Sequence, residues 1–362
     1  MNIIIGILLL FSLAGLLDLL TGGRLGLAPD FSKGLSAMGS LCLAMTGFYC
    51  GALWLGENAV GLLQQLQGLP VDPSLLPAAL LAPDMGGFPL SLSLASGQSM
   101  GLFSGILVSS TLGCLVSFSL PISPGMLSRE DSSQFMLGSA WGIALLPAGL
   151  IPGGLLLGLS FSQLVSGIFP VALLCGLLLL ALQLIPGFTV SAMNILGNLI
   201  RDLGYFLFIL LVFGLFFPEW AVFSPSLTGE AMLVVLKITA VVCGSMVLSH
   251  VVTTCCRKSL SSLSGRLGLD TESILGLILS LATSISMIPL YHRMDRRGQR
   301  INAAFAVGGA FCMGGQLAYI AAVTDSSAVG AYLVCKLTCG ICGALAAFCS
   351  FRKDDLCREK EG

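Results

Sequence analysis

Residues 162–185 read SQLVSGIFPVALLCGLLLLALQLI, and this stretch decides the class of the fold. It contains no Asp, Glu, Lys or Arg. A helix needs about 20 mostly apolar residues to cross the roughly 30 Å of hydrocarbon in a bilayer. The stretch meets both requirements, so it predicts a transmembrane helix.

Apolar stretches of the same kind lie on both sides of it, separated by short polar links. Together they predict an all-α, polytopic membrane protein with about eleven transmembrane helices, at residues 2–20, 35–56, 74–95, 99–122, 136–159, 162–185, 203–222, 231–252, 273–291, 301–323 and 327–350. Two further stretches, 57–69 and 187–202, are amphipathic and too short to span. These two predict connecting helices in the membrane interface.

Composition supports one membrane domain over the whole chain, residues 1–362. Hydrophobic residues make up 56% and charged residues 10%, and the mean hydropathy is +0.96. A soluble domain carries about 25% charged residues. We expect a first half at about 1–160, a linker helix at about 162–185, a second half at about 203–350 and a cytoplasmic tail at 351–362.

Charge indicates the orientation in the membrane and no nucleic-acid partner, since the net charge is −1. Cytoplasmic loops are enriched in Lys and Arg. The link 293–300 and the tail are the most basic segments, and Arg24 and Lys33 belong to the first link. With eleven spans these segments share one side, which predicts an outside N-terminus and a cytoplasmic C-terminus. The basic link 257–266 falls on the opposite side in this scheme.

The chain also resembles itself at a separation of 200 residues. LLAPDMGGFPL at 80–90 aligns with SLATSISMIPL at 280–290. Both segments are interrupted by Pro and polar residues, and each is followed by a helix rich in small residues. This pattern predicts two pseudo-repeated halves with interrupted helices. Paired breaks of this kind are the best sequence pointer to a transporter binding site.

Asp84 is the principal candidate site residue, because a charge in a span costs about 2.5–3.5 kcal/mol and is therefore usually functional. Pro83 leaves a carbonyl without its helical donor, and Gly86 and Gly87 allow the helix to unwind. A carboxylate beside free carbonyls suits a cation. The alternatives are that Asp84 caps a half-helix or pairs with a lysine.

Other polar side chains at membrane depth complete the predicted substrate site. These candidates are Thr283, Ser284 and Ser286 at the second break, Gln316 on the helix that follows, and Lys336 in the last span. No cofactor, metal site or catalytic residue is expected, because the chain lacks a P-loop and other enzyme motifs. Its scattered cysteines fit buried, hydrophobic roles.

Two motifs resemble the ethanolamine-utilisation permease family. The first is LLAPDMGGF at 80–88, and the second is MDRRGQRINAAFAVGGAFCMGGQLAY at 294–319. In the second motif the matching residues are Met294, Asp295, Arg297, Gly298, Ile301, Asn302, Ala304, Phe305, Ala306 and Val307. Lys336 falls where the family has a Lys-Leu pair. The chain departs from the family at Thr283-Ser284, where paired asparagines are expected, and at Gly315-Gln316, where Asp-His is expected.

The resemblance implies import of ethanolamine across a bacterial inner membrane, for ethanolamine catabolism, by alternating access. Ethanolamine is mostly protonated at neutral pH, which gives Asp84 a chemical partner. The two departures leave a related amino alcohol or amine open as the substrate. The alternatives are an ion-coupled transporter of another small solute such as an amino acid, and a membrane-embedded enzyme or non-transporting subunit. A homo-oligomer is also open.

Overall fold

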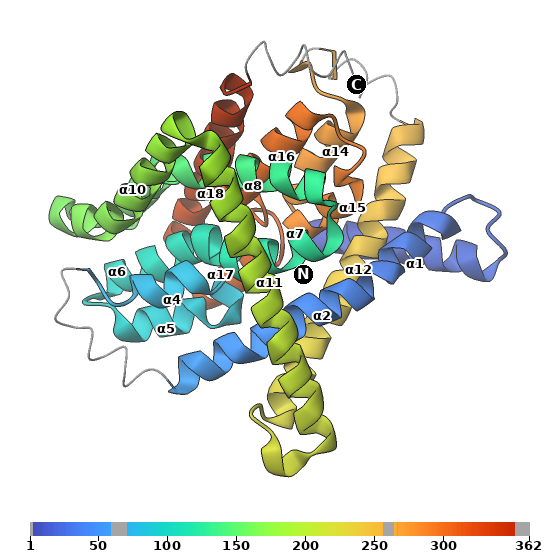
Figure 1. Ribbon diagram of the computed structural model, residues 1–362, viewed down its shortest axis with the longest axis horizontal. Coiled ribbons are helices and arrows are strands. Elements are labelled where there is room, and N and C mark those ends of the chain that lie inside the picture. The colour runs from blue at the N-terminus through green and yellow to red at the C-terminus, as the bar shows by residue number, and fades with distance from the viewer. Residues whose placement is uncertain (1–2, 59–70, 256–263, 266, 352–362) are drawn as a thin grey trace.

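The computed structural model describes residues 3–58, 71–255, 264–265 and 267–351 (Figure 1). Within these residues every regular element is a helix, which confirms the all-α prediction. The long helices are α1 (Ile3–Leu20), α2 (Ala28–Asn58), α10 (Phe161–Leu184), α11 (Pro186–Phe216), α12 (Pro225–Cys255) and α18 (Ser326–Cys349). The shorter ones are α4 (Leu75–Leu80), η2 (Pro83–Met85), α5 (Gly87–Leu94), α6 (Gln98–Leu102), η3 (Phe103–Gly113), η4 (Leu115–Ser119), α7 (Leu120–Met126), α8 (Arg129–Ala144), α9 (Pro147–Leu156), η5 (Pro218–Trp220), α14 (Thr271–Ser280), η6 (Ser284–Met287), α15 (Ile288–Tyr291), α16 (Arg296–Gly309) and α17 (Gly315–Val323).

Several of these helices are long and apolar enough to cross a membrane. In the described part of the chain five qualify, at Gln98–Ser123, Phe161–Leu184, Gly187–Phe216, Pro225–Val252 and Ser326–Cys349. The pair α8 and α9, bent by 42°, makes a sixth. The protein is therefore a multi-pass membrane protein. The predicted number of eleven spans is not confirmed, because the segments 74–95, 273–291 and 301–323 are not continuous helices.

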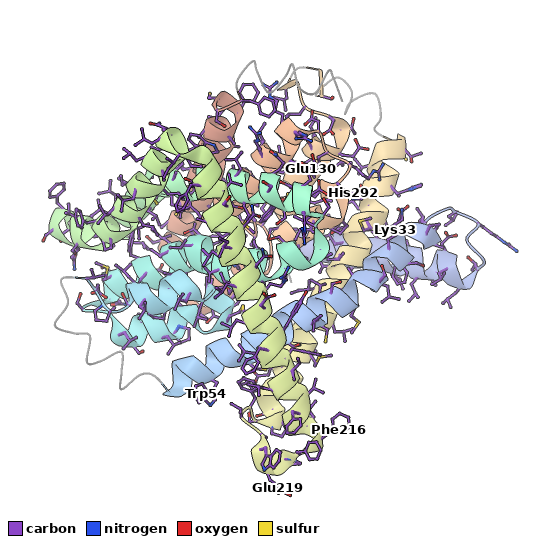
Figure 2. The ribbon with its side chains drawn as sticks, in the orientation of Figure 1. Lys33, Trp54, Glu130, Phe216, Glu219 and His292 are labelled. Atoms are coloured by element: carbon purple, nitrogen blue, oxygen red, sulfur yellow. The ribbon has the colours of Figure 1, made fainter. Side chains whose placement is uncertain are left out.

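The long helices α1, α2, α11 and α12 form one group. Helix α2 packs against both α12 and α11, and α1 packs against α12. Gly244 of α12 allows this last contact, because a Cβ there would collide with the carbonyl of Leu8. Helices α11 and α12 project together beyond the rest of the molecule (Figure 1). The exposed Glu219 lies at the tip of this projection (Figure 2).

The remaining helices form a second group, in which α16 packs against α8 and α18, and α18 packs against α9. The G-x-x-x-G pair Gly138 and Gly142 lies on the face of α8 that contacts the α16 backbone at Arg300 and Ala304. Small residues let helices approach closely in lipid. These glycines therefore serve packing.

The predicted span 74–95 is a helical hairpin, here named hairpin 1 (residues 72–96). Its two arms, α4 and α5, pack against each other. The Asp72 carboxylate joins the two ends, accepting hydrogen bonds from the backbone N–H of Ser74 (3.0 Å) and of Ser96 (3.1 Å). Burial raises the pKa of Asp72, but the hydrogen bonds from Ser74 and Ser96 outweigh it and leave the pKa below its usual value. The two ends of hairpin 1 therefore lie next to each other.

The predicted span 273–291 has the same form, here named hairpin 2 (residues 270–295). Its arms α14 and α15 pack against each other, with η6 at the turn. Asp270 joins the ends: its carboxylate accepts from the backbone N–H of Ser273 at 2.7 Å and from that of Asp295 at 2.7 Å. Both interrupted segments therefore return to the end from which they start.

The structure bears differently on the two predicted interfacial helices, 57–69 and 187–202. Residues 187–202 continue without a break into the rest of α11, so the prediction of a separate connecting helix is wrong there. The apolar residues 203–216 continue the same helix, so residues 187–202 are the first part of α11. The stretch 57–69 lies outside the described residues from residue 59 onward.

Candidate functional site

Asp84 lies at the turn of hairpin 1, where the sequence Ala-Pro-Asp-Met-Gly-Gly prevents a regular helix. Leu81 is extended, with φ −119° and ψ 137°, and Gly86 has φ 92°, a left-handed conformation that glycine adopts without strain. The carbonyl of Leu81 accepts a hydrogen bond from the Ser109 hydroxyl instead of a helical N–H. The backbone N–H of Ala82 donates to the Ser117 hydroxyl at 3.1 Å. The break is thus held by η3 and η4.

The Asp84 side chain is exposed, whereas Pro83 and Met85 on either side of it are buried. Its short helix η2 is contacted by α2, α5, η3 and α17, so it lies among other elements and not on an outer surface. No ion pair involves Asp84 among the described residues. The carboxylate lies within electrostatic range of Lys336, Tyr49 and Tyr319. The carboxylate is therefore accessible and unpaired within the helical body.

Lys336 is completely buried on α18, and its ammonium donates to the backbone carbonyl of Ser110 at 2.6 Å. The carbonyl belongs to η3, a stretch with wider, π-type turns, which are common at functional sites. The ammonium also lies within electrostatic range of the Cys114 and Cys312 thiols. Among the described residues no carboxylate pairs with it.

Gln316 is buried, and neither its amide nitrogen nor its amide oxygen has a hydrogen-bond partner of good geometry in the described part of the protein. Its polar neighbour is the Cys114 thiol, a weak hydrogen-bonding group. A buried amide without partners costs about 1–3 kcal/mol. Such a group is suited to binding a polar ligand.

The hydroxyls predicted at the second break have protein partners. Thr283 accepts from the backbone N–H of Ile285 at 3.3 Å, Ser284 lies 3.3 Å from the Ser119 hydroxyl, and Ser286 accepts from Ser245 at 2.8 Å. Ser284 therefore connects hairpin 2 to η4. Ser286 connects it to α12.

A third break, at residues 310–314 between α16 and α17, crosses the turn of hairpin 2. The backbone N–H of Phe311 donates to Ser280 at 3.0 Å, and that of Met313 donates to Leu281 at 2.8 Å. Phe311 has φ 63°, and its ring packs against Phe118 of η4. This crossing leads into α17, where Tyr319 packs edge-to-face on Phe88 of hairpin 1. The turn of hairpin 1 and the turn of hairpin 2 are therefore connected through η4 and α17.

The structure thus divides the predicted residues between two neighbouring places. Asp84, Gly86 and Gly87 lie at the turn of hairpin 1, near Lys336 and Gln316, and this set is named the Asp84 group. Thr283, Ser284 and Ser286 lie at the turn of hairpin 2. Sequence reasoning missed Tyr49, Cys114 and the Ser110 carbonyl. An aromatic or thiol in an apolar helix, and a backbone carbonyl, give no distinctive sequence signal.

Elsewhere in the described residues, three other features were candidates for a binding site, and none has the properties of the Asp84 group. A pocket of about 340 Å³ lies between α4 and α10 and is lined mostly by apolar side chains. No group of three or more His, Cys, Asp and Glu in the described segments could hold a metal ion. His250 pairs with Asp30 at 2.8 Å, between α12 and α2.

Comparison with known proteins finds relatives that match nearly the full length of the chain. The sequence profile of the family described as "Ethanolamine utilisation protein, EutH" matches residues 1–349. The chain is 32% identical to "Probable ethanolamine permease EutH" of Listeria monocytogenes, over 94% of this chain and 91% of that protein. It is 28% identical to the protein of the same name from Salmonella typhimurium, over 92% and 88%.

The Escherichia coli protein of that name is 29% identical, over 91% of this chain and 87% of its own length. No solved structure matches the chain. The profile match covers far more than half of the sequence, and it includes both hairpins and the Asp84 group. The chain belongs to the EutH family of ethanolamine utilisation proteins.

Proposed function

We propose that the protein imports ethanolamine, as the ammonium cation, across the bacterial cytoplasmic membrane by alternating access. The observation that carries this proposal is the Asp84 carboxylate, which is accessible and unpaired between α2, η3 and α17. An ammonium has three donors and forms strong, charge-assisted hydrogen bonds with a carboxylate. The name of two relatives, "Probable ethanolamine permease EutH", points in the same direction.

The hydroxyl end of ethanolamine has a candidate partner in Gln316. Its amide offers both a donor and an acceptor, and both lack hydrogen-bond partners of good geometry. A small molecule with an ammonium at one end and a hydroxyl at the other fits this pair of groups. Thr283, Ser284 and Ser286 hold the second hairpin in place beside the site, since Ser284 and Ser286 bond to other elements.

Lys336 is assigned the role of weakening the attraction between Asp84 and the bound cation. Its ammonium is fixed on the Ser110 carbonyl and acts on the Asp84 charge from a distance. It limits the attraction of Asp84 for cations without neutralising it by direct contact. Release of the substrate on the cytoplasmic side requires such a limit, because a carboxylate within the helical body with no positive charge near it would hold a cation too tightly.

Titration of purified protein with ethanolamine tests the site. Wild type is expected to bind one ethanolamine per chain, and Asp84→Asn is expected to weaken the affinity at least tenfold, because the charge partner is lost. Glu219→Gln, at the exposed tip of α11 and α12, is the matched control and should bind like wild type. Equal binding by Asp84→Asn and wild type would remove Asp84 from the site. Choline and propylamine as competitors test the ammonium and hydroxyl contacts separately.

A further inference from the structure

The two hairpins begin at opposite ends of the second helix group. This follows from the contacts at the two ends of α18. Near its C-terminal end, the Phe348 ring lies 3.9 Å from the Arg297 guanidinium, in the first turn after hairpin 2. Near its other end, Ala331 lies beside Gly153, which also contacts Leu107, in the helix that follows hairpin 1. A helix of this length spans about 36 Å. The bases of the hairpins are therefore about one membrane thickness apart.

The directions of the neighbouring helices agree. From Leu107 to Ser110 the helix after hairpin 1 advances along α18 in the same direction as α18 itself, since Ser110 bonds Lys336. Helix α16 runs the other way: Arg297 lies at Phe348, while Gly308 lies against Cys339. The helices that leave the two hairpins are thus antiparallel.

We propose that hairpins 1 and 2 are re-entrant, that they enter the membrane from opposite faces, and that their turns meet at the Asp84 group. The units 72–156 and 270–349 are then inverted repeats. Each begins with an Asp that joins the ends of a hairpin, Asp72 or Asp270, and continues with a helix from Gln98 or Arg296. Across the membrane midplane, Ser119 of one unit meets Ser284 of the other.

The charge distribution supports this topology independently of the contacts. With both hairpins re-entrant, links 59–71, 96–97, 157–160, 217–224 and 324–325 share one face, and none contains Lys or Arg. Of the 17 Lys and Arg, Arg201, Lys237 and Lys336 lie well within helices. By sequence position, every other one lies in a link, at the base of hairpin 2, within the first two turns of a helix that starts at the opposite face, or in the tail. That face is therefore cytoplasmic.

The basic link 257–266 is the decisive case. If the segments 74–95 and 273–291 crossed the membrane, this link would lie outside, against the rule. With re-entrant hairpins it joins α12 to hairpin 2 on the cytoplasmic face, and the exception disappears. The N-terminus remains outside and the C-terminus cytoplasmic, with nine crossing segments in the described part of the chain.

The topology gives each hairpin a role, and this part of the inference rests on the proposed function. Hairpin 1 separates the Asp84 group from the outside, and hairpin 2 separates it from the cytoplasm. The two turns close the site from opposite directions, and displacement of one turn exposes the site to one face only. Alternating access then needs small movements of two hairpins held at their bases by Asp72 and Asp270.

Cysteine labelling in cells tests the topology. The background replaces the exposed Cys255 and Cys349, together with Cys256 and the tail residue Cys357, with serine. Single cysteines are then placed at both ends of each hairpin, as Val71→Cys, Ser96→Cys, Leu267→Cys and His292→Cys. Ser160→Cys and Glu130→Cys mark the two faces outside the hairpins. A membrane-impermeant maleimide is applied to intact and to permeabilised cells.

The expected result is that positions 71 and 96 react in intact cells, together with 160. Positions 267 and 292 react only after permeabilisation, together with 130. A split within either pair shows that the segment crosses the membrane, and overturns the proposal. Labelling of both pairs from one face, or the reverse pattern, overturns the opposed orientation. Labelling does not require transport, so this failure is distinct from failure of the proposed function, which the ethanolamine titration tests.

Discussion

Gly87 is the residue on which the turn beside Asp84 depends most. A Cβ at this position would collide with the Ser109 hydroxyl and with the carbonyls of Leu81 and Ala82. Two of these three groups are backbone and cannot move away without opening the break. From the sequence alone, Gly87 is a predicted site residue because it permits unwinding. The structure adds a second reason, close approach between hairpin 1 and η3.

Gly87→Ala is therefore expected to destabilise the protein by about 1–3 kcal/mol, the usual cost of an overpacked core. It should also abolish ethanolamine binding, because Asp84 is displaced. Gly315→Ala is the matched control, since a Cβ there meets no atom within 4 Å. Melting temperature in detergent and ethanolamine titration measure the two effects. Wild-type behaviour of Gly87→Ala would refute the packing at this turn.

Some residues of the site are predictable from the sequence and others are not. Asp84 could be chosen from its depth in an apolar segment, and the structure leaves it accessible and unpaired. The partner of Lys336 could not be chosen, because it is the backbone carbonyl of Ser110, which any residue supplies. Likewise, the sequence cannot show that the Ser286 hydroxyl is occupied by Ser245, 41 positions away.

At the scale of elements, the main difference from expectation concerns the hairpins. An apolar segment of about 20 residues has the same hydropathy whether it crosses the membrane or returns halfway. Hydropathy alone therefore could not separate hairpins 1 and 2 from crossing helices. The distinguishing residues are Asp72 and Asp270, which bond both ends of each hairpin. In sequence each resembles an ordinary helix cap.

Asp270→Asn tests this use of both carboxylate oxygens. Asparagine caps a helix about as well as aspartate, but it has one acceptor oxygen and so cannot serve both Ser273 and Asp295. Loss of a hydrogen bond to a charged group should cost about 1.5–3 kcal/mol. Asp325→Asn is the control, because the bond described for Asp325 is a simple cap on Ala328. A melting temperature of Asp270→Asn no lower than that of Asp325→Asn would contradict the proposed closure of hairpin 2.

At the scale of the whole molecule, the sequence predicted the helical membrane class and the family, and it located both breaks. It could not give the relative direction of the two halves. That direction depends on contacts between distant segments, such as Arg297 with Phe348 and Lys336 with Ser110. Weak self-similarity at 80–90 and 280–290 is equally compatible with parallel and inverted repeats.

The central claim is that the molecule carries ethanolamine as a cation bound at Asp84, and that no other ion moves with it. Such transport moves net charge, and a membrane potential is worth about 2.3 kcal/mol per unit charge per 100 mV. Labelled ethanolamine should therefore accumulate about 50-fold in proteoliposomes held at 100 mV, inside negative. Vesicles containing Asp84→Asn should accumulate none above empty vesicles, and those containing Glu219→Gln should match wild type.

The most direct measurement is this potential-driven uptake, at mildly acidic pH so that the neutral amine, which crosses lipid unaided, is scarce. The account predicts accumulation by wild type that collapses when the potential is removed, and no accumulation by Asp84→Asn at equal protein content. Uptake by Asp84→Asn at the wild-type level, or wild-type uptake that ignores the potential, would contradict it.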